Sequence, residues 1–325
     1  MAATDRAPVG GVSVSRLGFG AATLGNLFAP VTDEDAHAAV ETAWDRGVRY
    51  FDTAPHYGLG LSERRLGEAL RAHPRDSYTL STKVGRILEP ADTGGTDTGF
   101  AVPATHRRVW DFSADGVRRS LEASLERLGL DRVDVVYLHD ADECGDGGTQ
   151  ALREAYPALE RLRAEGVVGA IGAGMNQVPP LERYLRETDA DVVLCAGRLS
   201  LLDQRAAHSL LPEAARRGRA VVVGGVFNSG LLADPQPGAT FDYRAASVDL
   251  LGRALRIKAV AEGHGVPLRA AALHFPFRYE AVASVLVGMR TAAEAADAAA
   301  MLDVAVPDEL WDELRAEGLL GEADG

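Results

Sequence analysis

Cysteine is nearly absent from this chain: only Cys144 and Cys195 occur among 325 residues. The two stand in unrelated contexts and lack the short paired spacing of a zinc site. A disulfide framework and a structural zinc site are therefore excluded as the basis of the fold. A reducing cytoplasm is the expected compartment.

Long apolar runs and an excess of positive charge are also missing. No stretch reaches the roughly 18 consecutive apolar residues of a membrane span, and Met1–Gly11 lacks the apolar segment of a secretory signal. The 34 basic residues are outnumbered by 47 acidic ones, which gives a net charge of -13. This charge disfavours nucleic acid and anionic membranes as partners, so we expect a soluble protein.

No Pro-, Gly- or Ser-rich linker divides the chain, so one domain is expected over residues 1–325. Short apolar runs alternate with longer amphipathic runs, which indicates alternating strands and helices. The eight expected strands are 17–21, 48–52, 78–83, 133–138, 167–171, 192–195, 220–223 and 282–287. The expected helices are 33–46, 62–71, 114–128, 152–165, 180–187, 204–217, 250–262 and 291–301. The pattern predicts an α/β fold, a (β/α)8 TIM barrel over about residues 12–305, with a C-terminal helix and tail at 306–325.

A doubly wound dinucleotide-binding sheet is the second interpretation. Such a sheet carries a three-glycine fingerprint after its first strand, whereas the segment Gly18–Thr23 (GFGAAT) lacks the third glycine. The barrel is therefore favoured. Residues 9–16 are expected to form a short hairpin over the barrel floor, because Gly10 and Gly11 suit a tight turn.

Four chemically active side chains stand at or just beyond the ends of successive expected strands. Asp52, Lys83 and His139 close the second, third and fourth strands, and Tyr57 follows in the second loop. Barrel enzymes place their active sites at this rim. Each residue alone is more often a cap, a surface residue or a core residue, but the four together predict an active site. An ammonium at Lys83 is expected to bring the pKa of Tyr57 down from about 10 toward the working range, with Asp52 as its counter-charge.

These residues belong to the motifs Phe51–Gly58 (FDTAPHYG), Ser81–Lys83 (STK) and Val136–His139 (VYLH). Through them the chain resembles the aldo-keto reductase superfamily over about residues 12–305. The resemblance implies an NAD(P)-dependent oxidoreductase that needs no metal. It also implies that Tyr57 is the proton donor or acceptor, that Lys83 and Asp52 tune it, and that His139 orients the reacting oxygen.

Three further segments are similar to the branch containing L-fucose dehydrogenase, D-threo-aldose 1-dehydrogenase and pyridoxal 4-dehydrogenase: 196–204 (AGRLSLLDQ), 224–232 (GGVFNSGLL) and 272–276 (ALHFP). This resemblance implies oxidation of an aldose at its anomeric carbon to a lactone. Oxidation of pyridoxal or reduction of a small aldehyde by the same four residues stays open. So does a different class, a cofactor-sensing regulatory subunit. A monomer or a homodimer is expected.

The loops after the seventh and eighth strands are the expected cofactor site, because barrels often bind phosphate there. The expected cofactor residues are Gly20, Asn176, Gly225, Phe227, Ser229, Gly230, Leu231, Gly288, Arg290 and Glu294. Backbone amides between 225 and 231 are expected to hold a pyrophosphate, and Arg290 to meet a phosphate or the adenine. Many relatives have a Gln and a stacking Tyr around the nicotinamide, where this chain has Ala196 and Gly224. Phe227 is either the substitute ring or a packing residue.

The resemblance aligns Glu294 with the Arg that meets the 2′-phosphate in NADP-preferring relatives. A carboxylate repels a phosphate dianion and accepts a hydrogen bond from a ribose hydroxyl, so NAD is expected in preference to NADP.

Two loops, 85–111 and 232–246, exceed the usual connection length and are expected to cover the substrate. Phe28, Trp110 and Phe112 are candidates for an apolar wall against a sugar, although core packing is an equal alternative. Asp140 is expected either to bind a substrate hydroxyl or to cap the next element.

Overall fold

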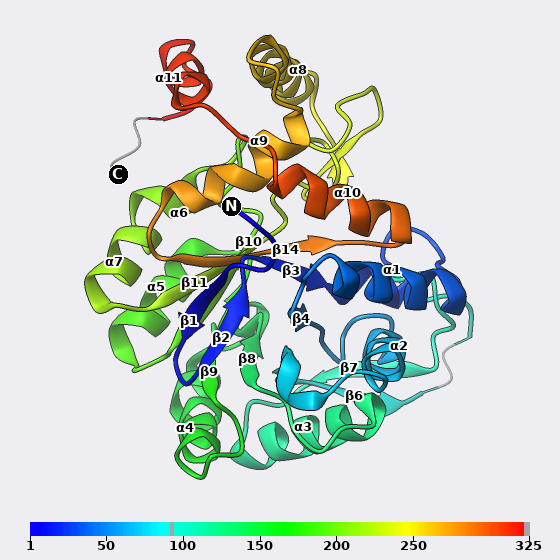
Figure 1. The fold of residues 1–325 in the computed structure, drawn as a ribbon. Coiled ribbons are helices and arrows are strands. Elements are labelled where there is room, and N and C mark those ends of the chain that lie inside the picture. The colour runs from blue at the N-terminus through cyan, green and yellow to red at the C-terminus, as the bar shows by residue number, and fades with distance from the viewer. Residues whose placement is uncertain (92–93, 322–325) are drawn as a thin grey trace.

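The computed structural model describes residues 1–91 and 94–321. Eight parallel strands form a closed barrel in which β14 pairs with β3 to complete the ring (Figure 1). In order around the ring they are β3 (Leu17–Gly20), β4 (Tyr50–Asp52), β5 (Thr79–Val84), β8 (Val135–His139), β9 (Ala170–Met175), β10 (Val192–Ala196), β11 (Ala220–Gly224) and β14 (Val282–Gly288). The predicted TIM barrel is confirmed.

Helices surround the barrel (Figure 1). Their buried side chains form one hydrophobic cluster with the outward side chains of the strands. The helices are α1 (Asp33–Asp45), α2 (Leu61–Leu70), α3 (Ala114–Leu128), α4 (Tyr156–Ala164), α5 (Val178–Glu187), α6 (Arg205–His208), α7 (Leu210–Arg217), α8 (Val248–Gly263), α9 (Leu268–His274), α10 (Ala292–Leu302) and α11 (Asp308–Ala316). Two helices end at a glycine C-cap: Gly129 ends α3 and Gly218 ends α7, with φ of 65° and 62°. Glycine adopts this left-handed conformation without steric cost.

One predicted helix is divided in the structure, and one helix was not predicted. The run 204–217 is two helices, because Ser209 between α6 and α7 leaves helical geometry with a φ of -141°. Between β11 and β14 the sequence predicted one helix, whereas α8 and α9 both form. Helix α8 packs against α11 outside the ring (Figure 1), and α9 packs against α10. The short α9 covers too few turns to show a clear amphipathic period.

The predicted floor hairpin is present and slightly longer than expected. Strands β1 (Arg6–Val9) and β2 (Val12–Ser15) pair in antiparallel fashion around Gly10, whose φ is 54°. Ala7, Val9 and Val14 are buried in one cluster with the inward side chains of the barrel. The hairpin therefore closes the end of the barrel opposite the predicted site.

The remaining elements lie in the connections between the strands and helices of the barrel, with η2 and η5 just before β5 and β14 and the others on the carboxyl side of a strand. They are η1 (Ala21–Gly25), η2 (Arg75–Ser77), η3 (Ala141–Glu143), η4 (Ala151–Ala155), η5 (Phe275–Arg278) and the hairpin strands β6 (Arg86–Pro90), β7 (His106–Trp110), β12 (Thr240–Phe241) and β13 (Arg244–Ala245). Residues 92–93 of the first predicted cover and 322–325 of the predicted tail lie outside the described residues. Across the part of the chain that is described, no helix combines the length and apolarity needed to cross a membrane.

Candidate active site

The four predicted residues meet at the carboxyl end of the barrel. Asp52 is the last residue of β4, and His139 the last of β8, while Lys83 stands one residue before the end of β5. Tyr57 follows β4 in a turn that packs tightly on η1: a Cβ on Gly58 would lie 2.4 Å from the carbonyl oxygen of Gly25. This close backbone contact holds the turn, and with it the tyrosine, against the barrel.

Asp52 and Lys83 form a buried ion pair. Lys83 Nζ lies 2.6 Å from Asp52 Oδ2 and donates a second hydrogen bond to the carbonyl oxygen of Thr53 at 3.0 Å. The two residues are only 3% and 2% exposed. Burial by itself lowers the pKa of Lys83, but the Asp52 carboxylate and Tyr57 outweigh burial and raise that pKa above its usual value. Lys83 is therefore a charged ammonium beneath the cavity.

Tyr57 lies directly against this ammonium, since Lys83 Nζ is 4.7 Å from the centroid of its ring. The expected fall in the pKa of Tyr57 is wrong for the protein without ligand. Burial raises the pKa of Tyr57 to about 12, and Lys83 opposes this rise without cancelling it. Desolvation wins because a phenolate loses more hydration on burial than one ammonium returns. Tyr57 is a phenol at neutral pH.

His139 faces Tyr57 edge to face, with ring centroids 5.8 Å apart and an interplanar angle of 88°. Burial, Arg86 and Lys83 hold the pKa of His139 well below its usual value, so the imidazole is neutral. A neutral imidazole retains one N–H donor. It can therefore orient an oxygen atom beside Tyr57 without adding a charge.

Two charged residues near His139 complete the site, and their contact was not predicted. Asp140 Oδ2 lies 3.3 Å from His139 Nε2 and 2.5 Å from Arg86 Nη2. Burial raises the pKa of Asp140 to about 6, and the Arg86 guanidinium opposes that rise. The carboxylate makes no capping bond to η3, so the capping alternative is wrong. Arg86 stands three residues after Lys83, which was the available signal.

His56 is a second imidazole that the prediction left out. Its ring centroid lies 5.6 Å from that of His139 and 5.3 Å from that of Phe100. Burial, followed by Arg86 and Arg108, lowers the pKa of His56 to about 3. Its place between Pro55 and Tyr57 in the sequence motif was the signal that could have identified it.

A cavity of about 970 Å³ opens beside Tyr57 and Asp52. This volume lies at the upper end of the roughly 300–1,000 Å³ typical of ligand pockets. Nine of the ten predicted cofactor residues line it: Gly20, Asn176, Gly225, Phe227, Ser229, Gly230, Gly288, Arg290 and Glu294. Four of the nine are glycines, which lets a ligand approach the backbone closely at those positions.

The tenth residue, Leu231, is fully buried in the core. Its amide donates to the carbonyl oxygen of Asn228 at 3.3 Å, and the amide of Gly230 donates to that of Phe227 at 3.0 Å. Both protons are used inside the turn, so neither amide is available for a pyrophosphate. Phe227 packs against the core with one part and lines the cavity with another.

Arg290 and Glu294 form a pair at the start of α10. Arg290 Nη2 lies 2.7 Å from Glu294 Oε1, and the Arg290 amide donates to Oε2 at 2.7 Å. A second pair, Arg269 with Asp297 at 2.8 Å, lines the same end of the cavity and was not predicted. This end therefore presents both signs of charge, each already matched by a partner.

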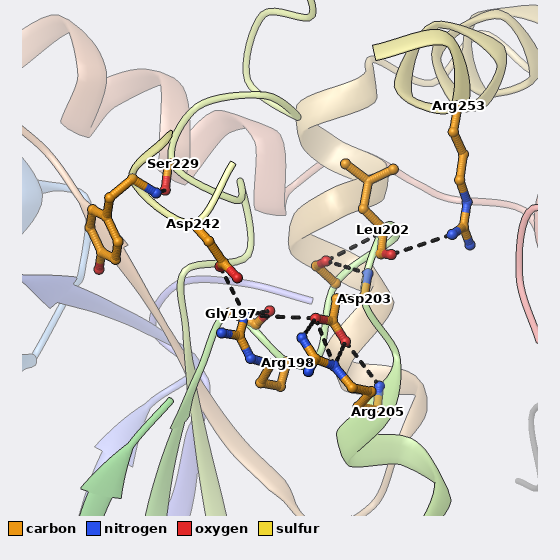
Figure 2. A network of polar contacts seen from close by, with 10 residues as sticks. Gly197, Arg198, Leu202, Asp203, Arg205, Ser229, Asp242 and Arg253 are labelled. Carbon is orange, nitrogen blue, oxygen red and sulfur yellow. Dashed lines mark hydrogen bonds and ion pairs between the residues drawn. The ribbon is translucent and has the colours of Figure 1, made fainter. Parts of the chain in front are cut away.

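Two hydrogen bonds hold the hairpin β12–β13 in place beside the cavity. Asp242 Oδ1 accepts a hydrogen bond from Arg198 Nη1 at 2.8 Å, and the amide of Tyr243 donates to Ser229 Oγ at 3.1 Å (Figure 2). Tyr243 also stacks on Phe28, with ring centroids 5.7 Å apart, and both line the cavity. The loop 232–246, which was predicted to cover the substrate, therefore lines the cavity.

The predicted apolar wall is only partly present. Phe28 lines the cavity and is 55% exposed. Phe112 is wrong as a wall residue, because it is fully buried and packs where a Cβ on Gly85 would come within 2.1 Å of its ring. Trp110 stacks on Phe112 on one side and under the Arg86 guanidinium, 4.4 Å away.

A closed parallel barrel with these four side chains at one mouth, beside a glycine-lined cavity, defines a barrel oxidoreductase with a dinucleotide cofactor. The chain belongs to the Aldo/keto reductase family, whose model matches residues 16–317. It is therefore an NAD(P)-dependent oxidoreductase with a small-molecule substrate. This sets aside the regulatory-subunit alternative.

Curated relatives are similar over nearly the whole chain. A D-threo-aldose 1-dehydrogenase from Pseudomonas sp is 46% identical, and the match covers 97% of each chain. A pyridoxal 4-dehydrogenase from Microbacterium luteolum is 40% identical over 95% of this chain and 96% of its own length. An L-galactose dehydrogenase from Arabidopsis thaliana is 34% identical over 87% and 83%.

Among solved structures, a glycerol dehydrogenase from Gluconobacter oxydans matches with a TM-score of 0.77 and 21% identity, covering 99% of this chain and 97% of that one. An aldo-keto reductase from Bacillus halodurans matches with a TM-score of 0.76 and 24% identity, covering 98% and 97%. At these identities the likeness demonstrates a shared fold.

Proposed function

We propose that this chain oxidises an aldose at its anomeric carbon to the lactone, with NAD preferred over NADP. The observation that carries the proposal is the gathering of Tyr57, Lys83, Asp52 and His139 within hydrogen-bond or ring-contact distance beside the cavity. The 46% identity to a D-threo-aldose 1-dehydrogenase supports the choice of substrate class.

The residues divide the work as follows. His139 donates its N–H to the anomeric oxygen and holds it beside Tyr57. Tyr57 accepts the hydroxyl proton while the C1 hydrogen leaves as hydride, so that the C–OH becomes the lactone carbonyl. Lys83 stabilises the phenolate that begins this step, and Asp52 keeps Lys83 in place. When bound, the nicotinamide supplies the hydride acceptor. General-base assistance of this kind contributes about 10²–10⁴ in rate.

The residues lining the cavity would hold a dinucleotide: Asn176 would bind the nicotinamide carboxamide and Arg290 the adenosine part. Glu294 supports a preference for NAD in two ways. Its carboxylate repels a 2′-phosphate, and its bonds to Arg290 occupy the guanidinium that would otherwise attract one. Measuring kcat/KM for NAD and NADP side by side tests this preference. A higher value for NADP would reject it.

A second candidate is oxidation of pyridoxal, which the 40% identity to a pyridoxal 4-dehydrogenase favours. The same four residues would act on the cyclic hemiacetal form of pyridoxal, in which the reacting carbon bears a hydroxyl: the carbon loses hydride to the nicotinamide and its oxygen loses a proton to Tyr57. The two candidates differ in what lines the outer part of the pocket.

A spectrophotometric screen for nicotinamide reduction separates these candidates. L-fucose, D-arabinose, L-galactose, L-xylose and pyridoxal are offered with each cofactor, and the Tyr57→Phe variant is the matched control for background reduction. We expect the highest kcat/KM with one of the sugars. Turnover of pyridoxal alone would favour the second candidate, and turnover of none would reject both.

A further inference from the structure

A layer of hydroxyl groups lies inside the barrel directly beneath the candidate active site. Side chains two residues apart on a strand face the same side. Tyr50 therefore lies below Asp52 on β4, Ser81 below Lys83 on β5, and Tyr137 below His139 on β8. Three neighbouring strands thus each carry one site residue and one hydroxyl residue.

The three hydroxyls form one connected chain that ends on Asp52. Tyr137 Oη lies 3.0 Å from Tyr50 Oη, and Tyr50 Oη lies 3.1 Å from Ser81 Oγ. Ser81 Oγ then donates to Asp52 Oδ1 at 2.7 Å. Lys83 binds the other carboxylate oxygen, Oδ2. Both oxygens of Asp52 are therefore held, one by the hydroxyl chain and one by the ammonium.

The direction of every proton in this chain follows from its end. A carboxylate that faces an ammonium can only accept, so the proton of Ser81 goes to Asp52. Ser81 has no second proton, so Tyr50 donates to Ser81, and by the same reasoning Tyr137 donates to Tyr50. Burial raises the pKa of both tyrosines, so each keeps its proton. All three dipoles therefore point toward the carboxylate, the arrangement that strengthens a chain cooperatively.

The surroundings show that this layer is built into the core. Tyr50, Ser81 and Tyr137 are all fully buried. The hydrophobic side chains buried around the two tyrosines are all aliphatic, as is usual inside such barrels. Gly18 leaves room for the Tyr50 ring, since a Cβ there would lie 2.9 Å from its Cδ1. Phenylalanine at 50 and 137 would fill the same space without any polar group to satisfy.

We propose that Tyr50, Ser81 and Tyr137 are positioning residues, whose hydroxyl chain fixes the Asp52 carboxylate and thereby the direction in which Lys83 presents its ammonium to Tyr57. This inference rests on the proposed role of Tyr57 and Lys83 in proton transfer. Without the chain, Asp52 Oδ1 loses its donor, the carboxylate turns, and Lys83 follows it away from the phenol.

The ammonium of Lys83 can be observed directly, because the chain contains only two lysines, Lys83 and Lys258. Labelling the intact protein with ¹⁵N-lysine gives two side-chain signals, and Lys258→Arg assigns them. Ser81→Ala is expected to move the Lys83 Nζ resonance. Tyr50→Phe, which leaves the ring in place, is expected to move it in the same direction by a smaller amount.

Ser284→Ala is the matched control. Ser284 is a fully buried serine of β14 whose hydroxyl donates to the carbonyl oxygen of Ser15 at 2.7 Å, outside the chain of hydroxyls. This control removes a buried hydroxyl from the barrel wall and should leave the Lys83 resonance unchanged. Thermal unfolding of each variant separates a loss of stability from a loss of position.

Turnover provides the second measurement. Ser81→Ala is expected to lower kcat by at least about tenfold, the lower end of what one lost hydrogen bond to a charged group represents, with KM for substrate and cofactor nearly unchanged. If Ser81→Ala and Tyr50→Phe match Ser284→Ala in both measurements, the chain is only structural and the proposal is wrong. A moved resonance with an unchanged kcat also contradicts it.

The resonance needs no substrate, so the two proposals can fail separately. If the protein turns over no sugar and no pyridoxal, the proposed function fails, and the Lys83 resonance alone decides whether the hydroxyl chain positions the ammonium.

Discussion

At the scale of the single residue, two opposing effects act on the pKa of Tyr57. Burial disfavours its phenolate, and the Lys83 ammonium, 4.7 Å from the ring centroid, favours it. We expect Tyr57→Phe to lower kcat by about 10²–10⁴, because only the proton carrier is lost. Stopped-flow or steady-state turnover measures this, and NADH fluorescence titration should give an unchanged Kd.

A second tyrosine provides the control for that substitution. Tyr184 on α5 is buried between the helices and the outside of the barrel and is not among the residues that line the cavity, so Tyr184→Phe removes a phenol that does not contact the cavity. Its kcat should equal that of the wild type. Equal loss of activity in both variants would mean that the Tyr57 effect is one of folding.

The raised pKa of Tyr57, about 12, also predicts the pH dependence. Below that pKa the phenolate fraction grows about tenfold with each pH unit, and oxidation needs the phenolate as its base. Oxidation should therefore accelerate from neutral into alkaline pH, while reduction, which needs the phenol, should not. When bound, the positively charged nicotinamide ring of the oxidised cofactor would lower the pKa of Tyr57. Initial rates in both directions across this range test the sign, and oxidation that slows with rising pH would contradict it.

The site residues differ in how far the sequence could predict them. Asp52, Lys83 and His139 could be predicted from the sequence, because the carboxyl ends of the strands in a parallel barrel meet at one rim. The direction of the shift in the pKa of Tyr57 could not be predicted from the sequence, because it depends on how much water the folded pocket removes from the phenol. The contact between Asp140 and Arg86 depends on the path of the chain from β5 into β6, which no periodicity encodes.

At the scale of elements, the β12–β13 hairpin lines the cavity and is held in place by hydrogen bonds to Arg198 and Ser229. Asp242 and Tyr243 adopt positive φ, 47° and 62°, the conformation of a tight two-residue hairpin turn. The ion pair between Arg198 and Asp242 is partly buried, since the Arg198 side chain is 7% exposed and the Asp242 side chain 39%. Figure 2 shows Arg198 reaching from the end of β10 to Asp242. The two turn residues are therefore in a backbone conformation that side chains disfavour, and the bond to Arg198 holds them in a fixed position above the cavity.

We expect Asp242→Asn to loosen this hairpin and to speed the release of NADH several-fold, since it replaces a charge-assisted bond with a neutral one. Stopped-flow displacement of bound NADH measures the rate. Asp131→Asn, an exposed substitution in the turn before β8, is the control. An unchanged release rate in Asp242→Asn would mean that the hairpin does not retain the cofactor.

At the scale of the whole molecule, the stability of the closed barrel depends on how closely neighbouring strands approach each other. On β9, an added Cβ at Gly172 would lie 1.8 Å from the carbonyl oxygen of Val192 on β10, whereas one at Gly174 would meet nothing closer than 3.5 Å. The two glycines stand on the same inward face of the same strand. Neither was identified from the sequence, because the requirement arises only when β9 and β10 are brought together.

Gly172→Ala should therefore destabilise the fold much more than Gly174→Ala. The clash falls on backbone, which cannot move without shifting two strands of a closed ring, so we expect a loss of at least about 2–3 kcal/mol. For Gly174→Ala the change should stay within about 1 kcal/mol, because its contacts are ordinary and alanine restricts the unfolded chain. Urea unfolding followed by circular dichroism compares the two variants at equal pH and temperature. Similar midpoints for both would mean that the ring relaxes at β9 and that its closure is less rigid than the register of β9 and β10 implies.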